Sequence, residues 1–287
     1  MPKRILVLVA PALLPLAFTG GLAAAQAPSS ESAPRAAQDS GCHPVGSSGA
    51  QACANDYRVD GRAVQAILFR PSGAGPFPGI LLIPGYERTA ENLVPLGSRL
   101  AEAGFAGLAV TQPGFGKSEG PADYVGPKTL RVLAIGYRKL QGEPFVDPQR
   151  MGIYGFSRGA MAASLLVLDL PDVRAAVFGG GIYDFRAAYR DSTLRGVREN
   201  MKAETGMAEE AVRARSSILR MEQLRCPVLI LHGENDVNVP VSQARLLRDR
   251  LTKLHKDFEI KLFPGRDHSI GPEVGVLTLD FFERKLK

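Results

Sequence analysis

The sequence has no tryptophan, three cysteines and no long uninterrupted apolar run. With aromatic residues at 7%, the absence of tryptophan argues against a carbohydrate-binding face of stacked rings. There is no HExxH, paired CxxC or Asp-rich calcium loop, so we predict no metal ion. The formal net charge is +6, but the basic residues are scattered along the chain and do not form a run. We therefore predict no nucleic-acid partner.

No cofactor is predicted either. The segment from Gly114 to Ser118 ends like a phosphate-binding loop, but Thr111 stands where that motif requires a glycine. The other motifs described below need no bound group. We therefore expect the chain to act through its own side chains.

The first residues have the composition of a secretory signal. Lys3 and Arg4 make a positive start, residues 5–18 form an apolar stretch, and residues 25–27 (Ala-Gln-Ala) form a small-x-small cleavage site. Two prolines interrupt the apolar stretch, which is shorter than the roughly 20 residues of a membrane-spanning helix. We therefore predict a signal peptide over residues 1–27, export to the periplasm or the exterior, and no stable membrane anchor.

Export would permit disulfide bonds. Cys42 and Cys53 bracket a short segment rich in glycine and serine, and a bridge between them would stabilise the fold by about 3 kcal/mol. We predict this bridge. Cys226 precedes Pro227 at the start of an apolar strand, and we expect its thiol to be buried and unreactive.

The remaining chain divides by composition into a linker and one folded domain. Residues 28–51 are rich in serine, alanine, proline and glycine without apolar periodicity, which predicts a disordered linker. Residues 52–287 would then form a single domain. Within it, residues 182–224 are polar, charged and helix-prone, and we expect a helical lid inserted over the carboxyl ends of the strands.

Apolar runs alternate with helical patterns along this domain, which predicts the α/β class with a mostly parallel central sheet and helices on both faces. The run at residues 79–83 has no polar face and predicts a buried strand. The expected strands are residues 64–69, 79–83, 106–110, 151–154, 175–178, 227–231 and 259–263, and the expected helices are residues 93–103, 130–140, 160–170, 241–254 and 274–286.

One motif joins an expected strand to an expected helix. Gly155-Phe156-Ser157-Arg158-Gly159 has the G-x-S-x-G pattern of a nucleophile elbow, in which a serine is exposed on a tight turn. The glycines fit because side chains there would collide with the neighbouring strand and helix. A serine hydroxyl is a weak nucleophile at neutral pH, so Ser157 needs a base within hydrogen-bond reach.

His268 is the candidate base, because it lies in the loop between the last expected strand and the last expected helix. The other histidines lie in the linker (His43), at a strand end (His232) and in a charged helix tail (His255). A base at His268 would overhang the elbow.

Asp236 is the candidate acid that orients this base, since it lies in the loop directly after the expected strand at residues 227–231. Glu234 is a near rival. Asp267 is adjacent to His268 and is badly placed to reach the far nitrogen of its ring. We therefore expect a Ser157, Asp236, His268 triad.

An oxyanion hole needs two donors near the serine. One is expected from the backbone of Arg158, the residue after the nucleophile. The second is expected from Tyr86, in the loop after the strand at residues 79–83. Tyr86 could donate through its N–H or its hydroxyl, and the sequence does not decide between them.

With these residues in place, the chain from about Asp60 resembles the α/β-hydrolase superfamily, and more narrowly dienelactone hydrolases and the catalytic domain of prolyl oligopeptidase-type peptidases. Three stretches carry the resemblance: residues 146–152, the elbow at residues 155–159, and residues 226–233 before the acid loop. The resemblance implies acyl transfer to water through an acyl-enzyme at the serine.

Two departures shape the expected activity. Dienelactone hydrolases use a cysteine nucleophile where this chain has Ser157, so lactone specificity is not implied. Prolyl oligopeptidases carry a propeller before the catalytic domain, where this chain has a short linker. We therefore expect a carboxylic ester hydrolase acting on a small-molecule ester. A small peptidase or amidase and a catalytically silent binding protein remain the alternatives, and the sequence does not determine the oligomeric state.

Overall fold

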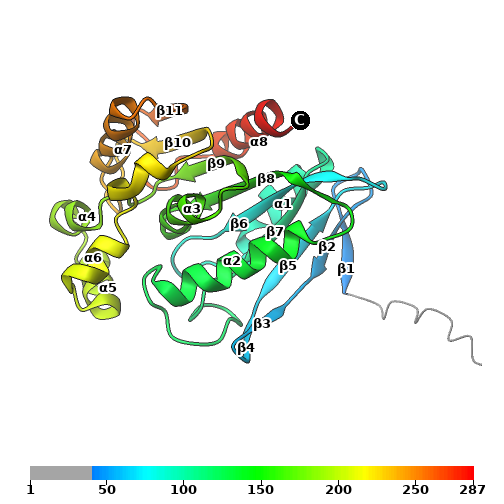
Figure 1. Ribbon diagram of the computed structural model, residues 1–287, viewed down its shortest axis with the longest axis horizontal. Helices are drawn as coiled ribbons and strands as arrows, with labels where there is room; N and C mark the ends of the chain where they lie inside the picture. Colours follow the sequence, from blue (N-terminus) through cyan, green and yellow to red (C-terminus); the bar gives the residue numbers. More distant parts are fainter. Residues whose placement is uncertain (1–40) are drawn as a thin grey trace, which may run out of the picture. The chain divides into compact units, whose positions relative to one another are not determined.

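Strands of residues 41–287, the part of the chain that the computed structural model describes, build one nine-stranded sheet (Figure 1). Its strand order is β1-β2-β5-β7-β6-β8-β9-β10-β11. The pairs β1–β2, β2–β5 and β5–β7 are antiparallel, whereas every pair from β7 to β11 is parallel. The strands are β1 (Cys42–Val45), β2 (Ala50–Ala54), β5 (Ala66–Arg70), β6 (Phe77–Ile83), β7 (Ala106–Val110), β8 (Val146–Phe156), β9 (Val173–Gly179), β10 (Val228–Gly233) and β11 (Phe258–Phe263).

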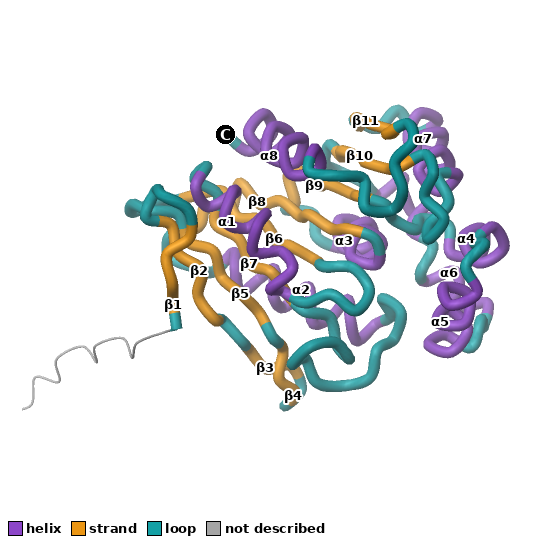
Figure 2. Tube along the Cα trace, turned by 180° about the vertical axis from the view of Figure 1, so that it is seen from behind, coloured by secondary structure: helices purple, strands orange, loops and turns teal. Residues whose placement is uncertain are grey.

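Helices cover both faces of this sheet, and Figures 1 and 2 show the two faces in turn. On one face pack α1 (Val94–Glu102), which follows the short 3-10 helix η1 (Ala90–Leu93), and α8 (Glu273–Leu286). On the other face pack α2 (Pro127–Gln141), α3 (Arg158–Asp169) and α7 (Ser242–Lys253). Two further strands, β3 (Tyr57–Val59) and β4 (Arg62–Val64), form a separate hairpin.

Strand β6 shows why a run without polar residues forms a central strand. Leu81 and Ile83 belong to the core beneath α2 and α3, whereas Ile80 and Leu82 belong to the core beneath α1 and α8. All four side chains are fully buried, because successive side chains point to opposite faces and both faces are covered. The predicted α/β class, with a mostly parallel sheet between helical layers, is confirmed.

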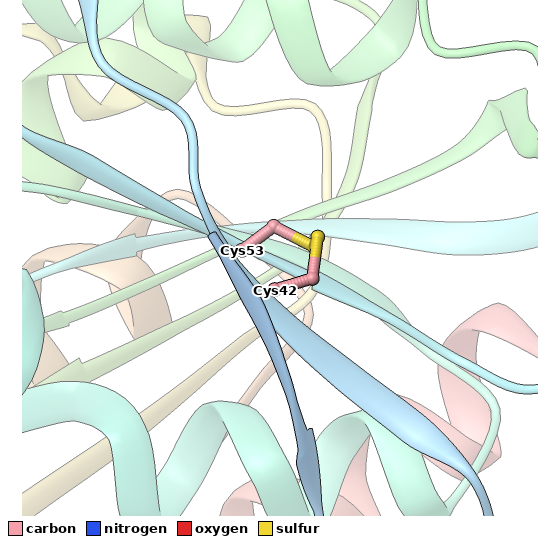
Figure 3. Close-up of a disulfide and its surroundings, with 2 residues drawn as sticks. All are labelled: Cys42 and Cys53. Atoms are coloured by element: carbon pink, nitrogen blue, oxygen red, sulfur yellow. A yellow bond between two sulfur atoms is a disulfide. The ribbon is translucent and has the colours of Figure 1, made fainter. Parts of the chain in front are cut away.

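The predicted linker boundary is wrong for residues 42–51. Strand β1 pairs with β2 from Cys42 opposite Cys53 to Val45 opposite Ala50. Cys42 and Cys53 form a disulfide, which Figure 3 shows between these neighbouring strands. The segment has too little apolar periodicity to be recognised as a strand, but the ladder and the covalent bond hold it at the edge of the sheet. The predicted signal peptide and residues 28–40 lie outside the described residues.

The insertion expected at residues 182–224 consists of helices. They are α4 (Phe185–Asp191), α5 (Arg195–Thr205), α6 (Glu209–Ala214) and the 3-10 helix η2 (Ser217–Gln223). Figures 1 and 2 show α4, α5 and α6 as one group. None of the helices in residues 41–287 has the length and apolar character needed to cross a membrane.

Candidate active site

Ser157 lies at the sharp turn between β8 and α3. Its backbone angles, φ 55° and ψ −121°, fall in a region that side chains seldom adopt. The turn is held by the Ser157 N–H, which donates to the carbonyl of Gly179 at 2.7 Å, and by the N–H groups of Ala160 and Met161, which donate to the Ser157 carbonyl. The strained turn lifts the hydroxyl above the end of the sheet, as the motif predicts.

The two glycines of the motif are required by space. A Cβ on Gly155 would lie 2.1 Å from the carbonyl oxygen of Gly159, and a Cβ on Gly159 would lie 2.1 Å from that of Ile83 in β6. Both contacts are to backbone, which cannot swing aside. The helix therefore approaches the sheet closely enough to place the serine beside β6.

A chain of two hydrogen bonds links Ser157 to a histidine and a carboxylate. His268 Nε2 lies 2.9 Å from Ser157 Oγ, and His268 Nδ1 lies 2.6 Å from Asp236 Oδ2. An ionised carboxylate only accepts, so Nδ1 carries the hydrogen and the Nε2 lone pair faces the hydroxyl. This arrangement can take a proton from Ser157 as its oxygen attacks a carbonyl.

Asp236 is buried, and each of its oxygens has two polar neighbours. Oδ1 accepts from the N–H groups of Asn238 and Val239, both at 2.9 Å. Oδ2 faces His268 and also His232 Nε2, at 3.2 Å. Burial alone would raise the pKa of Asp236, but the hydrogen bonds from His232, His268 and the backbone outweigh it and lower the pKa to about 2. Asp236 is therefore ionised at neutral pH.

His232 is a contact of the acid that sequence reasoning missed. Its side chain is fully buried at the end of β10, and its Nε2 lies 2.9 Å from the carbonyl oxygen of Val239. Because a carbonyl only accepts, Nε2 carries the hydrogen and can also point toward Asp236. The four-residue spacing from His232 to Asp236 was visible in the sequence, but a buried strand-end histidine gives no sign of its partner.

The rivals for the acid have other partners. Glu234 is paired at the surface with Arg245, at 3.4 Å, and Asp267 accepts the N–H of Ser269 in its own loop. Neither contacts the histidine ring. The loops that carry Asp236 and His268 are joined by backbone, since the Asn235 N–H donates to the carbonyl of Arg266 at 2.8 Å.

The two residues predicted for the oxyanion hole both lie close to the serine. Arg158 is the first residue of α3, so its N–H has no acceptor within its own helix. Gly85, the residue before Tyr86, approaches so closely that a Cβ there would lie 3.2 Å from Ser157 Cβ. The Tyr86 ring stacks on the Arg158 guanidinium, 4.5 Å from its central carbon. Partial burial, together with a hydrogen bond and charge from Glu87, raises the Tyr86 pKa, so its hydroxyl stays protonated.

A cavity of about 300 Å³ opens over Ser157 and His268. Aromatic side chains of Tyr86, Tyr124 and Phe156 line part of it, and the insertion contributes Ile182, Val197 and Asn200. This volume is at the lower end of the range for ligand pockets, which suits a compact substrate. The described residues hold no cluster of side chains fitted to a metal ion.

Comparison with known proteins relates the chain to both peptidases and esterases. The uncharacterized peptidase YtmA of Bacillus subtilis is 28% identical over 225 residues, which cover 76% of this chain and 86% of YtmA. The esterase FrsA of Citrobacter koseri is 29% identical over 204 residues, which cover 65% of this chain and 48% of FrsA. The chain thus spans most of YtmA but about half of FrsA.

Two solved structures share the fold at low identity. A puromycin-hydrolyzing peptidase of Mycobacterium tuberculosis superposes with a TM-score of 0.72 and 21% identity, over 82% of this chain and 39% of that one. An acetyl xylan esterase from Paenibacillus sp. R4 superposes with a TM-score of 0.70 and 18% identity, over 83% and 84% of the two chains. Both are similar to this chain in their α/β-hydrolase fold.

The model of the prolyl oligopeptidase family matches residues 128–287, which are more than half of the chain and include Ser157, Asp236 and His268. The chain belongs to the prolyl oligopeptidase family, and it is a serine hydrolase with the α/β-hydrolase fold.

Proposed function

We propose that this serine hydrolase cleaves small carboxylic esters through an acyl-enzyme at Ser157. The observation that carries the proposal is the Ser157–His268–Asp236 chain of hydrogen bonds, at 2.9 and 2.6 Å, beneath a cavity of about 300 Å³. His268 accepts the serine proton and then donates it to the leaving alcohol. In the second half of the reaction His268 activates water, which releases the acid. Asp236 keeps Nδ1 protonated and stabilises the imidazolium.

The proposed oxyanion hole consists of backbone donors from Arg158 and Tyr86. The N-terminus of α3 adds a partial positive charge where the tetrahedral oxygen becomes negative. The Tyr86 ring stacks on Arg158, and Asn200 and Glu87 are hydrogen-bonding neighbours of its hydroxyl. These contacts favour the Tyr86 N–H, not the hydroxyl, as the second donor.

The preference for esters rests on the small cavity and on the esterase FrsA among the relatives. YtmA supports the alternative, a small peptidase using the same residues. The two functions separate in a panel of p-nitrophenyl esters and aminoacyl p-nitroanilides, because amide cleavage also needs the leaving amine protonated. We expect ester turnover to dominate. Comparable turnover of the anilides would favour the peptidase.

A fluorophosphonate probe tests the nucleophile itself. We expect stoichiometric labelling of the folded wild-type protein and none of a Ser157→Ala variant. A folded wild-type protein that neither reacts with the probe nor hydrolyses any ester would instead support the silent binding protein.

We also propose that the protein is exported. Residues 1–27 have the composition of a signal peptide, and a disulfide such as Cys42–Cys53 persists in oxidising compartments. Mass spectrometry of the protein purified from the periplasm or medium of an expressing bacterium tests this. The expected mature chain begins at Pro28, and recovery of only the full-length chain from the cytosol would contradict it.

A further inference from the structure

The side chain of Arg158 has surroundings that its proposed backbone role does not explain. Although it is an arginine beside an open cavity, its side chain is only 4% exposed. Its guanidinium carbon lies 4.0 Å from the centroid of the Tyr124 ring, 4.5 Å from that of Tyr86 and 5.4 Å from that of Phe115. Tyr86 lies in the loop after β6, and Phe115 and Tyr124 lie in the loop between β7 and α2, so one cation contacts both of these loops.

Glu204 completes this arrangement from the insertion. Its two oxygens accept from both terminal nitrogens of Arg158, at 2.8 and 3.1 Å, in a bidentate pair. Oε2 also accepts the N–H of Tyr124 at 2.7 Å. Glu204 thus connects helix α5 to Arg158, the residue after the nucleophile, and to the loop that carries Tyr124.

The loop at Tyr124, to which Glu204 is hydrogen-bonded, has a strained backbone. Tyr124 and the β-branched Val125 have φ values of 45° and 59°. A second buried arginine, Arg215 of the insertion, holds the same turn, since its Nε donates to the carbonyl of Tyr124 at 2.9 Å and its Nη2 to that of Asp123 at 2.6 Å. The insertion is therefore fastened to the body of the enzyme by two buried arginines rather than resting on it.

Helix α5 turns the same face to the cavity and to this ion pair. Val197 and Asn200 line the cavity, and Glu204 follows on the same stripe of the helix. A shift of α5 would move all three together. The cavity volume of about 300 Å³ is at the lower end of the range for ligand pockets, which favours a short acyl group.

We propose that the Glu204–Arg158 pair determines substrate size: by fixing α5 as a wall of the pocket, it restricts the enzyme to esters of short-chain acids. This inference rests on the proposed esterase function. Glu204 and Arg158 act here as positioning residues, through Val197 and Asn200, and the Arg158 side chain does not touch the reacting atoms.

The test measures kcat/KM for p-nitrophenyl acetate, butyrate and octanoate. In the wild-type enzyme we expect acetate to be preferred over octanoate. A Glu204→Gln variant keeps the side-chain shape but removes the charge, so α5 loosens and the octanoate-to-acetate ratio rises about tenfold, as expected when a pocket gains room for apolar groups. The matched control is Glu199→Gln, which breaks an exposed pair with Arg195 on the same helix and leaves the ratio unchanged.

A second pair of variants tests the wall directly and does not depend on the ion pair. Val197 is partly exposed, so Val197→Ala and Val197→Phe can be accommodated in the fold. We expect the octanoate-to-acetate ratio to rise in Val197→Ala and to fall in Val197→Phe. Ratios that stay within about twofold of wild type in Glu204→Gln and in both Val197 variants would overturn the proposal.

Hydrogen exchange separates this proposal from the esterase function. Amide exchange in α5 should accelerate in Glu204→Gln and not in Glu199→Gln, whether or not the protein turns over any ester. If the wild-type protein hydrolyses no ester but exchange in α5 accelerates in Glu204→Gln, the esterase function is rejected and the role of Glu204 in fixing α5 is kept. If ester hydrolysis is normal but exchange in α5 is unchanged in Glu204→Gln, the role of Glu204 is rejected and the esterase function is kept.

Discussion

The two sides of the pocket are each organised around a carboxylate, and the two carboxylates are held differently. Asp236 lies in a loop at the end of β10, and neighbouring backbone N–H groups and two histidines hold it. Glu204 lies on an inserted helix, and an arginine and one N–H from distant segments hold it. The first is positioned by the sheet, whereas the second itself positions a helix.

This difference predicts that the residues at the sheet edge govern the reaction, whereas the wall at α5 governs which substrate is accepted. Strands β8, β10 and β11 bring their carboxyl ends to one edge, so the reactive residues keep their geometry even if the insertion moves. The wall at α5 has no such scaffold and is held by side-chain contacts to the body of the enzyme, chiefly the Glu204–Arg158 pair. Variants of the first region, which consists of Ser157, His268 and Asp236, should therefore abolish turnover. Variants of the second region, which consists of α5 and the Glu204–Arg158 pair, should change substrate choice and stability.

The largest effect is expected from Ser157→Ala. Without the nucleophile, ester turnover should fall by about 10⁶-fold, because the remaining donors alone give little acceleration. The measurement is kcat for p-nitrophenyl acetate, with a thermal melt to verify folding. No variant of Glu204 should approach this loss, and a Glu204→Gln enzyme as inactive as Ser157→Ala would erase the distinction between the two regions.

Asp236→Asn should lower kcat by about 10⁴-fold, because an amide no longer enforces the Nδ1-protonated form of His268. Asp267→Asn is the matched control, since Asp267 is an exposed residue next to His268 and its carboxylate accepts the N–H of Ser269 in its own loop. Its kcat should stay close to that of wild type. A larger loss for Asp267→Asn than for Asp236→Asn would show that the acid has been wrongly assigned.

For the second region the expected loss is in stability. Glu204→Ala leaves the buried Arg158 charge without its partner and should cost about 3–5 kcal/mol of unfolding free energy, whereas Glu199→Ala on the same helix should cost less than about 1 kcal/mol. Urea denaturation measures both. Replacing Arg158 and Glu204 together by methionine should recover much of the loss, because no buried charge is then unpaired. Equal losses in the two alanine variants would contradict the burial argument.

The same contrast governs what the sequence could predict. The strands before Ser157, Asp236 and His268 can be recognised from their apolar runs. The order of the three residues along the chain matches their places at the sheet edge, so the sequence pattern alone indicated them. Gly155 and Gly159 could be predicted because they belong to the same local motif as Ser157. Most of the expected helices and strands also lie within a few residues of the observed ones.

Contacts between distant segments could not be read in this way. Glu204 is one of many charged residues in a polar helix, and nothing local distinguishes its carboxylate from that of Glu199. Likewise, the strand at Cys42–Val45 is recognisable only through its pairing with β2. Both depend on tertiary partners, which periodicity does not encode.

The smallest expected effect is the pH dependence that Asp236 gives to stability. Its pKa is about 2 in the folded protein and about 3.9 in an unfolded chain, so the unfolded state takes up the proton first as the pH falls. The resulting stabilisation, about 2–3 kcal/mol, is fully present above about pH 5 and is mostly lost by pH 2. Urea denaturation of wild type and Asp236→Asn between pH 5 and 2 should therefore show a stability difference that shrinks by about 2 kcal/mol.

Asp267→Asn should follow the pH dependence of wild-type stability, because the carboxylate of Asp267 lies in an exposed loop. Identical slopes for wild type and Asp236→Asn would mean that the donors around Asp236 serve to orient it without stabilising its charge.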